Sequence, residues 1–173
     1  MVRSALGAPR KIGEGPPSYA PYIPALTVVA ASLMSALPIV SVSGWYPDFA
    51  FLVLISWRLH RADPFPAWWA APLGLINDLF TGSPLGFSVA SWCAAILALD
   101  LADRRTMWRD YWIEWVLAAV LIVIEQWFEW RVAAWSGADV PLVQMAPPLV
   151  IAILMFPVAA WLVSRIDRWR LAR

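Results

Sequence analysis

The sequence predicts an all-α membrane protein, a bundle of about six transmembrane helices, and three observations support this fold class. Of the 173 residues, 61% are hydrophobic and only 14% are charged, whereas soluble domains average about 45–50% apolar and about 25% charged residues. The apolar residues form long runs, and a bilayer is the solvent that tolerates so little polar surface. The third observation is the count of 13 tryptophans, because Trp favours membrane–water interfaces.

The apolar runs follow a polar segment at residues 1–21, which we expect to be a flexible cytoplasmic arm. The runs are residues 22–43, 47–60, 65–80, 84–101, 111–135 and 141–164. The second and third are short for full spans, so two short steep helices and a partly re-entrant hairpin both remain open. The competing count is five spans or fewer. The predicted domains are the arm, a six-helix transmembrane domain at 22–164 and a basic cytoplasmic tail at 165–173.

The distribution of basic residues predicts the orientation. With six spans, the N-terminus, the 58–65 and 102–110 loops and the C-terminus share one side, and together they contain 12 of the 13 basic residues. The loops on the other side contain none. The positive-inside rule therefore places both termini in the cytoplasm. Trp57 and other tryptophans lie near the predicted interfaces, which is typical of anchoring rings.

The stretch GLINDLFTGSPLG, Gly74 to Gly86, places a carboxylate near the outer end of the third run. Gly74, Asp78 and Gly82 are spaced by four residues, so they share one face if the helix continues that far. Small residues at this spacing let another helix approach closely. Thr-Gly-Ser-Pro then predicts a tight turn, with Pro84 early in the next helix and Gly86 in its first turn.

Asp78 has three open interpretations. In the first, it braces the turn by bonding to the hydroxyls of Thr81 or Ser83 or to the free amides of the next helix. In the second, it contacts a partner protein. In the third, it transfers a proton or binds a ligand. If it is a brace, we expect Asp78→Asn to be mild, since the amide oxygen keeps two acceptor sites. The bracing role is the preferred hypothesis.

The fifth run contains Glu125 and Glu129 within the membrane, four residues apart, and Glu125 lies near the midplane. A charge at mid-helix costs about 2.5–3.5 kcal/mol on insertion scales, so we expect both carboxylates to face the bundle interior or a partner. A buried hydrogen bond or ion pair, a polar cavity or partner face, and a proton-coupled role all remain open. Arg131 lies on a different stripe, near Trp127 and Trp135, where cation–π contact is expected.

Catalytic and metal-binding classes find no support. One Cys and one His exclude Cys-cluster and multi-histidine sites, and there is no Gly-rich phosphate loop and no Ser/His/Asp set. We expect no cofactor, no metal and no nucleic-acid partner. His60 is expected to be solvated at the inner surface, and the basic C-terminal segment to anchor the chain to anionic membrane lipids.

The second run, YPDFAFLVLISWRLHR, followed by GLINDLFTGSPLG, resembles the bacterial MreD family of rod shape-determining membrane proteins. Gly74, Asp78, Gly82 and Gly86 match the Gly-x-x-x-Asp-x-x-x-Gly-x-x-x-Gly signature of that family. The resemblance covers most of the chain, and residues 46–86 contain its specific part. It also implies a likeness to the six-helix substrate-binding components of vitamin transporters.

The resemblance implies a non-enzymatic scaffold of the bacterial inner membrane that takes part in cell-shape control and lateral peptidoglycan synthesis. The implied partners are the bitopic MreC protein and, through it, the actin-like MreB filament, the RodA glycosyltransferase and a class B penicillin-binding protein. Two alternatives from other classes are a component for uptake of a vitamin-like small molecule, and an intramembrane enzyme or lipid-handling protein.

Overall fold

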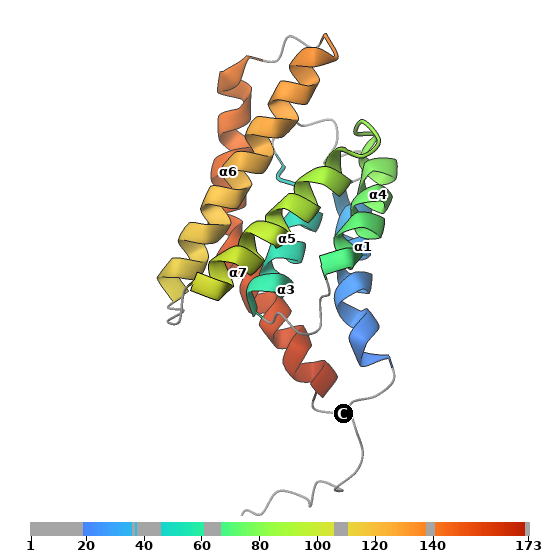
Figure 1. Cartoon of the computed structure of the whole chain (residues 1–173), viewed down its shortest axis with the longest axis vertical. Coiled ribbons are helices and arrows are strands. Elements are labelled where there is room, and N and C mark those ends of the chain that lie inside the picture. Colours follow the sequence, from blue (N-terminus) through green and yellow to red (C-terminus); the bar gives the residue numbers. More distant parts are fainter. Residues whose placement is uncertain are drawn as a thin grey trace, which may run out of the picture.

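In a computed structural model the chain is an all-α bundle (Figure 1), described over residues 19–35, 37, 46–60, 67–105, 111–137 and 141–171. Its α-helices are α1 (Ile23–Ser35), α3 (Phe49–His60), α4 (Ala70–Thr81), α5 (Phe87–Arg105), α6 (Tyr111–Trp135) and α7 (Ala146–Leu171). Short 3-10 turns at Ala20–Tyr22, Ala67–Trp69 and Leu142–Met145 precede α1, α4 and α7. The described ranges contain no strand, so the predicted all-α class is confirmed. Most of the predicted arm lies outside the described residues.

The helices alternate in direction along the bundle (Figure 1). α1 rises from the lower end, α3 descends, α4 rises, and α5, α6 and α7 continue the alternation. The start of α1 and the end of α7 therefore meet at the lower end, where Arg170 Nη1 donates a hydrogen bond to the Ala20 carbonyl at 3.0 Å. The two described ends of the chain therefore lie at the same end of the bundle.

α3 is the central helix of the bundle. Nine of its 12 residues are buried, including the polar side chains of Ser56 and Arg58. It packs against α1 and α7 and also contacts α5 and α6. At 1.5 Å per residue the helix is about 18 Å long, shorter than the hydrocarbon layer. Because protein encloses α3, its ends need no contact with lipid, which explains how so short a run fits among longer helices.

Trp57 corrects one expectation about the tryptophans. Its ring is fully buried in protein and so is not free to anchor the chain in lipid, because it lies in the last turn of the central helix. The indole Nε1 donates to Thr27 Oγ1 of α1 at 2.8 Å, and the Arg170 guanidinium of α7 lies 5.2 Å from the ring centroid. This one side chain therefore ties α1, α3 and α7 together.

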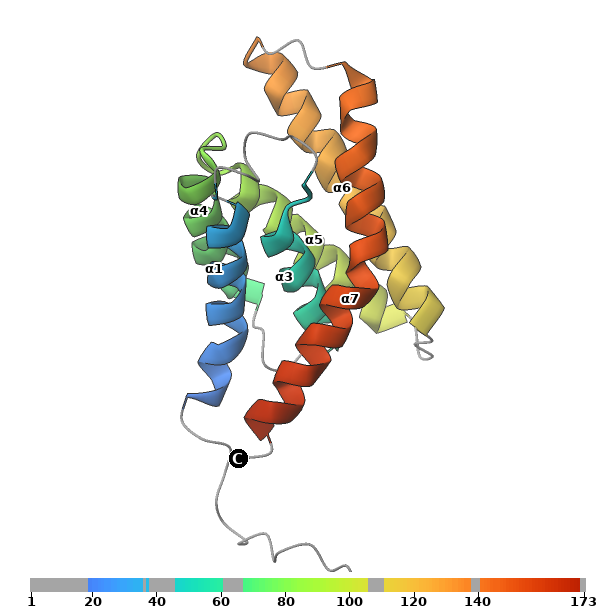
Figure 2. The same ribbon diagram turned by 180° about the vertical axis from the view of Figure 1, so that it is seen from behind.

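α6 and α7 form a hairpin whose upper end projects beyond the turn between α4 and α5 in both views (Figure 2). By length and composition, Tyr111–Trp135 and Leu142–Leu171 are the two described helical segments able to cross a membrane. Their exposed large apolar residues include Val116, Val120, Ile124, Phe128, Val150, Leu154, Val158 and Trp161. Apolar surface of this extent is typical of contact with lipid or with a partner.

Candidate functional site: the α4–α5 hairpin and its polar cavity

Gly82 ends α4 in the left-handed conformation, with φ at 71°. Its backbone N–H donates to the carbonyl of Asp78 at 3.0 Å and so satisfies one of the free carbonyls at the helix end. Thr81 Oγ1 donates to the Asn77 carbonyl at 2.9 Å and also lies 2.9 Å from Ser83 Oγ. These short-range bonds close the turn without using the Asp78 carboxylate.

The Asp78 carboxylate instead caps the start of α5. Its Oδ2 accepts a hydrogen bond from the Gly86 N–H at 2.7 Å, and its Oδ1 accepts one from the Ser88 N–H at 2.9 Å. The side chain is only 1% exposed. Of the bonding partners expected for Asp78, the structure shows the amides of the next helix and not the Thr81 or Ser83 hydroxyls. Because the free amides of a helix N-terminus carry partial positive charge, they are suited to hold an anion.

Pro84 and Gly86 lie before α5 rather than inside it, so the predicted helix start is wrong. α5 begins at Phe87, and Gly86 has a φ of 94° that no helical residue adopts. Pro84 belongs to the turn, where its carbonyl accepts from the Phe87 N–H at 3.0 Å. The physical reason is that the Asp78 carboxylate draws the Gly86 amide towards α4 and delays the helix.

Gly74 lies at the crossing of α4 and α5, where the two backbones touch. A Cβ added there would lie 2.7 Å from the Val89 nitrogen and 2.8 Å from the Ser88 carbonyl carbon and oxygen. The glycine is therefore required by close approach, as its position on the face of Asp78 predicted. Gly74 brings α5 close to α4, and Asp78 one turn later binds the amides of α5.

Asp48 and Asn77 join the hairpin to α3, and neither is among the site residues predicted from the sequence. Asp48 Oδ1 accepts from the Ala50 N–H at 2.8 Å and from the Phe51 N–H at 3.2 Å, so it caps α3. Asn77 Nδ2 donates to Asp48 Oδ2 at 3.2 Å and to Ser88 Oγ at 3.1 Å. An Asp directly before an apolar run is an N-cap signal and would have revealed the first role. No sequence signal pairs Asn77 with Asp48, because the contact is tertiary.

Two hollows adjoin the hairpin. A cavity of about 560 Å³, here called the polar cavity, lies between the start of α3, the end of α4 and α6, and its polar lining includes Tyr46, Asp48, Asn77, Glu125, Gln126 and Glu129. A groove of about 620 Å³, here called the apolar groove, lies between α5 and α6. Glu125 lines both.

Glu125 is 7% exposed and points to the interior, whereas Glu129 is exposed at the edge of the polar cavity. Gln126 Nε2 donates to Glu129 Oε2 at 2.9 Å. Asp48 lines the same cavity as Glu125 and Glu129. The structure thus brings the two predicted carboxylates to one cavity and adds Asp48 as a third.

Arg131 lies apart from these carboxylates. Its guanidinium carbon is 6.0 Å from the Trp127 ring centroid, 5.9 Å from that of Trp130 and 5.9 Å from that of Trp135. The expected cation–π contacts with Trp127 and Trp135 are therefore present, and Trp130 adds a third. Arg131 forms no ion pair with Glu129 within the described residues.

A second polar cluster, also missed from the sequence, lies at the opposite end of α3. Arg58 is buried, its Nε donates to Asp100 Oδ1 at 3.0 Å, and its Nη2 forms a further ion pair with the same oxygen. Its Nη1 lies 3.2 Å from Asp103 Oδ2. Arg58 was expected in a loop, but α3 continues through it, so two carboxylates of α5 neutralise its charge inside the bundle.

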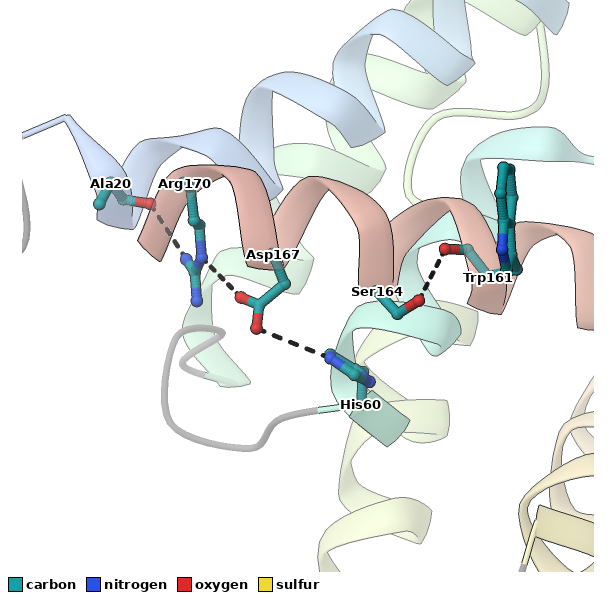
Figure 3. Close-up of polar contacts among 6 residues, drawn as sticks. All are labelled: Ala20, His60, Trp161, Ser164, Asp167 and Arg170. Carbon is teal, nitrogen blue, oxygen red and sulfur yellow. Dashed lines mark hydrogen bonds and ion pairs between the residues drawn. The ribbon is translucent and has the colours of Figure 1, made fainter. Parts of the chain in front are cut away.

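His60, Asp167 and Arg170 lie close together where α3 and α7 pack (Figure 3). His60 is exposed, as expected, and its Nε2 lies 3.6 Å from Asp167 Oδ2 of α7. Arg170 Nε donates to Asp167 Oδ1 at 2.6 Å, and Arg170 is 4% exposed. Arg170 therefore contacts protein, whereas Arg165 and Arg168 of the same basic segment are exposed. α7 continues through the predicted tail as far as Leu171, so Asp167 and Arg170 belong to the same helix.

The arrangement suits recognition and helix packing. Within the described ranges no group of three or more His, Cys, Asp or Glu side chains is placed to hold a metal ion. Gly74 and Asp78 hold α4 and α5 together at the hairpin. The carboxylate-rich polar cavity and the apolar groove lie beside it.

Comparison with known proteins identifies the family. The model of the family MreD, rod shape-determining protein MreD, matches residues 20–166. No curated protein matches the chain, and no solved structure does. The matched region includes all of α1, α3, α4, α5 and α6 and most of α7, and it contains the whole hairpin and both hollows. The chain therefore belongs to the MreD family of rod shape-determining membrane proteins.

Proposed function

We propose that this chain is a non-enzymatic scaffold of the bacterial inner membrane that helps the elongation machinery direct lateral peptidoglycan synthesis. The observation that supports this most strongly is the family match over residues 20–166, since the family is named for rod shape. The exposed apolar faces of α6 and α7 are compatible with a membrane location. Hydrolytic or metal chemistry is not needed to explain any described cluster.

The proposed topology is six passes with both termini in the cytoplasm. Two observations support it: the described ends of α1 and α7 adjoin at one end of the bundle, and 12 of the 13 basic residues belong to segments predicted on that side. Reporter fusions at both termini and at residue 138 test it. A cytoplasmic signal from residue 138, or a periplasmic one from either terminus, contradicts the topology.

The proposed partner is a bitopic MreC-like protein, whose single transmembrane helix occupies the apolar groove. Ala90, Ala94 and Ala98 line the α5 wall, exposed and spaced by four residues. Leu121, Ile124 and Phe128 line the α6 wall. A stripe of small residues permits close helix approach in a membrane. Through this partner the chain would act with MreB, RodA and a class B penicillin-binding protein.

Filling the groove tests the partner site. Ala94→Phe places a ring in the groove from an exposed position, so we expect normal membrane levels and co-purification of the MreC-like protein reduced about tenfold or more, which corresponds to about 1.4 kcal/mol. Leu97→Phe is the matched control, because Leu97 is exposed on the same helix and lies outside the groove. Equal co-purification by the two variants contradicts the groove as the partner site.

Depletion tests the function itself. Rod-shaped cells depleted of the protein should become round, because lateral wall synthesis loses its scaffold, and the wild-type gene should restore them. Cells that keep their width and length overturn the scaffold function. Cells that keep their shape but fail to take up a vitamin-like compound indicate the transporter alternative instead.

A further inference from the structure

The polar cavity contains a surplus of hydrogen-bond acceptors. Asp48, Glu125 and Glu129 contribute carboxylates to its lining, and Asn77 contributes an amide. Like charges placed together in a poorly hydrated site repel one another unless a cation or a set of donors joins them. A group of carboxylates does not by itself indicate a binding site. The stronger indication is that some acceptors in this lining have no hydrogen-bond donor.

Two buried acceptors in this lining have no donor within the part of the chain that the structure describes. Asn77 is 1% exposed and uses its Nδ2 for Asp48 and Ser88, while its Oδ1 accepts no hydrogen bond. Glu125 is 7% exposed, and its carboxylate has neither a hydrogen bond nor an ion pair there. An acceptor without a donor in such a site is unfavourable, and more so when it is charged. Because Glu125 lines the polar cavity, its carboxylate can accept from a donor that enters there.

The described cations of this chain are engaged or placed elsewhere. Arg58 is paired with two aspartates of α5, and Arg170 with Asp167. Arg131, near Glu129 in sequence, lies among three indole rings. Arg165 and Arg168 belong to the last part of α7, at the opposite end of the bundle from the cavity (Figure 1). Within the described residues, the arginines of this chain therefore provide no cation for the polar cavity.

We propose that the polar cavity is a receptor for one basic side chain, Lys or Arg, of a protein partner, with Glu125 as its main counter-ion. Glu125 also lines the apolar groove, so a helix lying in the groove can direct a basic residue past Glu125 into the cavity. In this form the inference rests on the proposed function, because the partner is the same MreC-like protein. A guanidinium or ammonium group supplies several donors to such a cluster.

The first experiment measures the cavity without any partner. The purified full-length protein in detergent is heated with butylguanidinium chloride or with the neutral analogue butylurea. We expect butylguanidinium alone to raise Tm by about 2–4 °C, and Glu125→Gln to abolish that rise. Glu129→Gln, at an exposed position, should weaken it, and Glu114→Gln, on the same helix outside the cavity, should leave it unchanged. An equal response to both compounds, or an unchanged response in Glu125→Gln, overturns the proposal.

The second experiment identifies the source of the cation. Glu125→Gln should reduce co-purification of the MreC-like protein by about ten- to a hundredfold, as expected for the loss of a charge-assisted hydrogen bond. Each Lys and Arg in and beside the partner's transmembrane segment is then replaced by Gln. We expect one replacement to reproduce the loss and to add little to Glu125→Gln.

The outcomes separate this inference from the proposed function. If Ala94→Phe abolishes co-purification of the partner while Glu125→Gln and every partner replacement leave it unchanged, the result supports the apolar groove as the partner site. The same result contradicts the polar cavity as a receptor for a basic side chain. If butylguanidinium stabilises the protein but no basic residue of the partner matters, a small-molecule or lipid cation replaces the partner side chain, and the proposal is overturned. If the wild type retains its butylguanidinium response but binds no MreC-like protein, the proposed partner is wrong while the cation-binding cavity stands.

Discussion

The carboxylate of Asp78 accepts a hydrogen bond from the backbone N–H of Ser88 at 2.9 Å, joining α4 to the first turn of α5. The second carboxylate oxygen accepts from the Gly86 N–H at 2.7 Å, so both oxygens serve the same helix start. This pair of bonds makes Asp78 a tertiary cap, because the acceptor and the donors belong to different helices. The position of Asp78 along α4 therefore determines where α5 begins and how it is oriented against α4.

The cap predicts a graded series at Asp78. The mildness expected for Asn from the sequence assumed that a single oxygen would suffice, but the amide nitrogen of Asn cannot accept the second backbone N–H. We expect Asp78→Asn to cost about 1–3 kcal/mol of unfolding free energy and Asp78→Ala more, because Ala loses both bonds. Thermal unfolding in detergent and membrane levels measure the order. If Asp78→Asn unfolds at the same temperature as the wild type, the cap contributes little to stability.

Gly74→Ala should destabilise the hairpin by about 1–3 kcal/mol or more, because its Cβ would meet backbone atoms that have no rotamer to adopt. Gly82→Ala is the comparison: a Cβ there meets nothing within 4 Å, so its loss reports only the strain of the left-handed backbone at φ 71°. Tm values of both variants give the comparison. A smaller loss for Gly74→Ala than for Gly82→Ala would mean that α5 shifts easily away from α4.

Substitutions at Gly82 should differ in stability according to how well each residue adopts the left-handed backbone conformation. Its φ of 71° is tolerated by Asn and resisted by β-branched residues. We expect Gly82→Val to cost about 1–3 kcal/mol and Gly82→Asn clearly less. Unfolding of the two purified variants decides this. Similar losses for Asn and Val would indicate that the left-handed turn is not what the glycine provides.

Arg58→Leu should destabilise the protein by about 3–5 kcal/mol, towards the lower end because its aspartate partners are partly exposed. Removing the guanidinium leaves Asp100 and Asp103 facing each other without a counter-ion. Adding Asp100→Asn and Asp103→Asn to that variant should recover part of the lost unfolding free energy. The exposed Arg165→Leu change serves as a control, for which we expect about 0.5 kcal/mol or less. No recovery in the triple variant would show that Arg58 acts by packing rather than by charge.

The sequence by itself determined the all-α class and the six helical runs, because hydrophobic run length and composition are local properties that a bilayer or a core constrains directly. It also identified Gly74 and Asp78 as one helix face and Arg131 as a partner of aromatic rings, since both follow from the periodicity of a single helix. The tertiary structure alone decided which groups Asp78, Arg58, Asn77 and Trp57 contact. Their partners are distant in the chain, and a hydrogen bond or ion pair depends on separations of about 3 Å that spacing along one helix does not specify. For the same reason the acceptor surplus around Glu125 emerged only when α3, α4 and α6 came together, since it is a property of the whole cavity and not of any one segment.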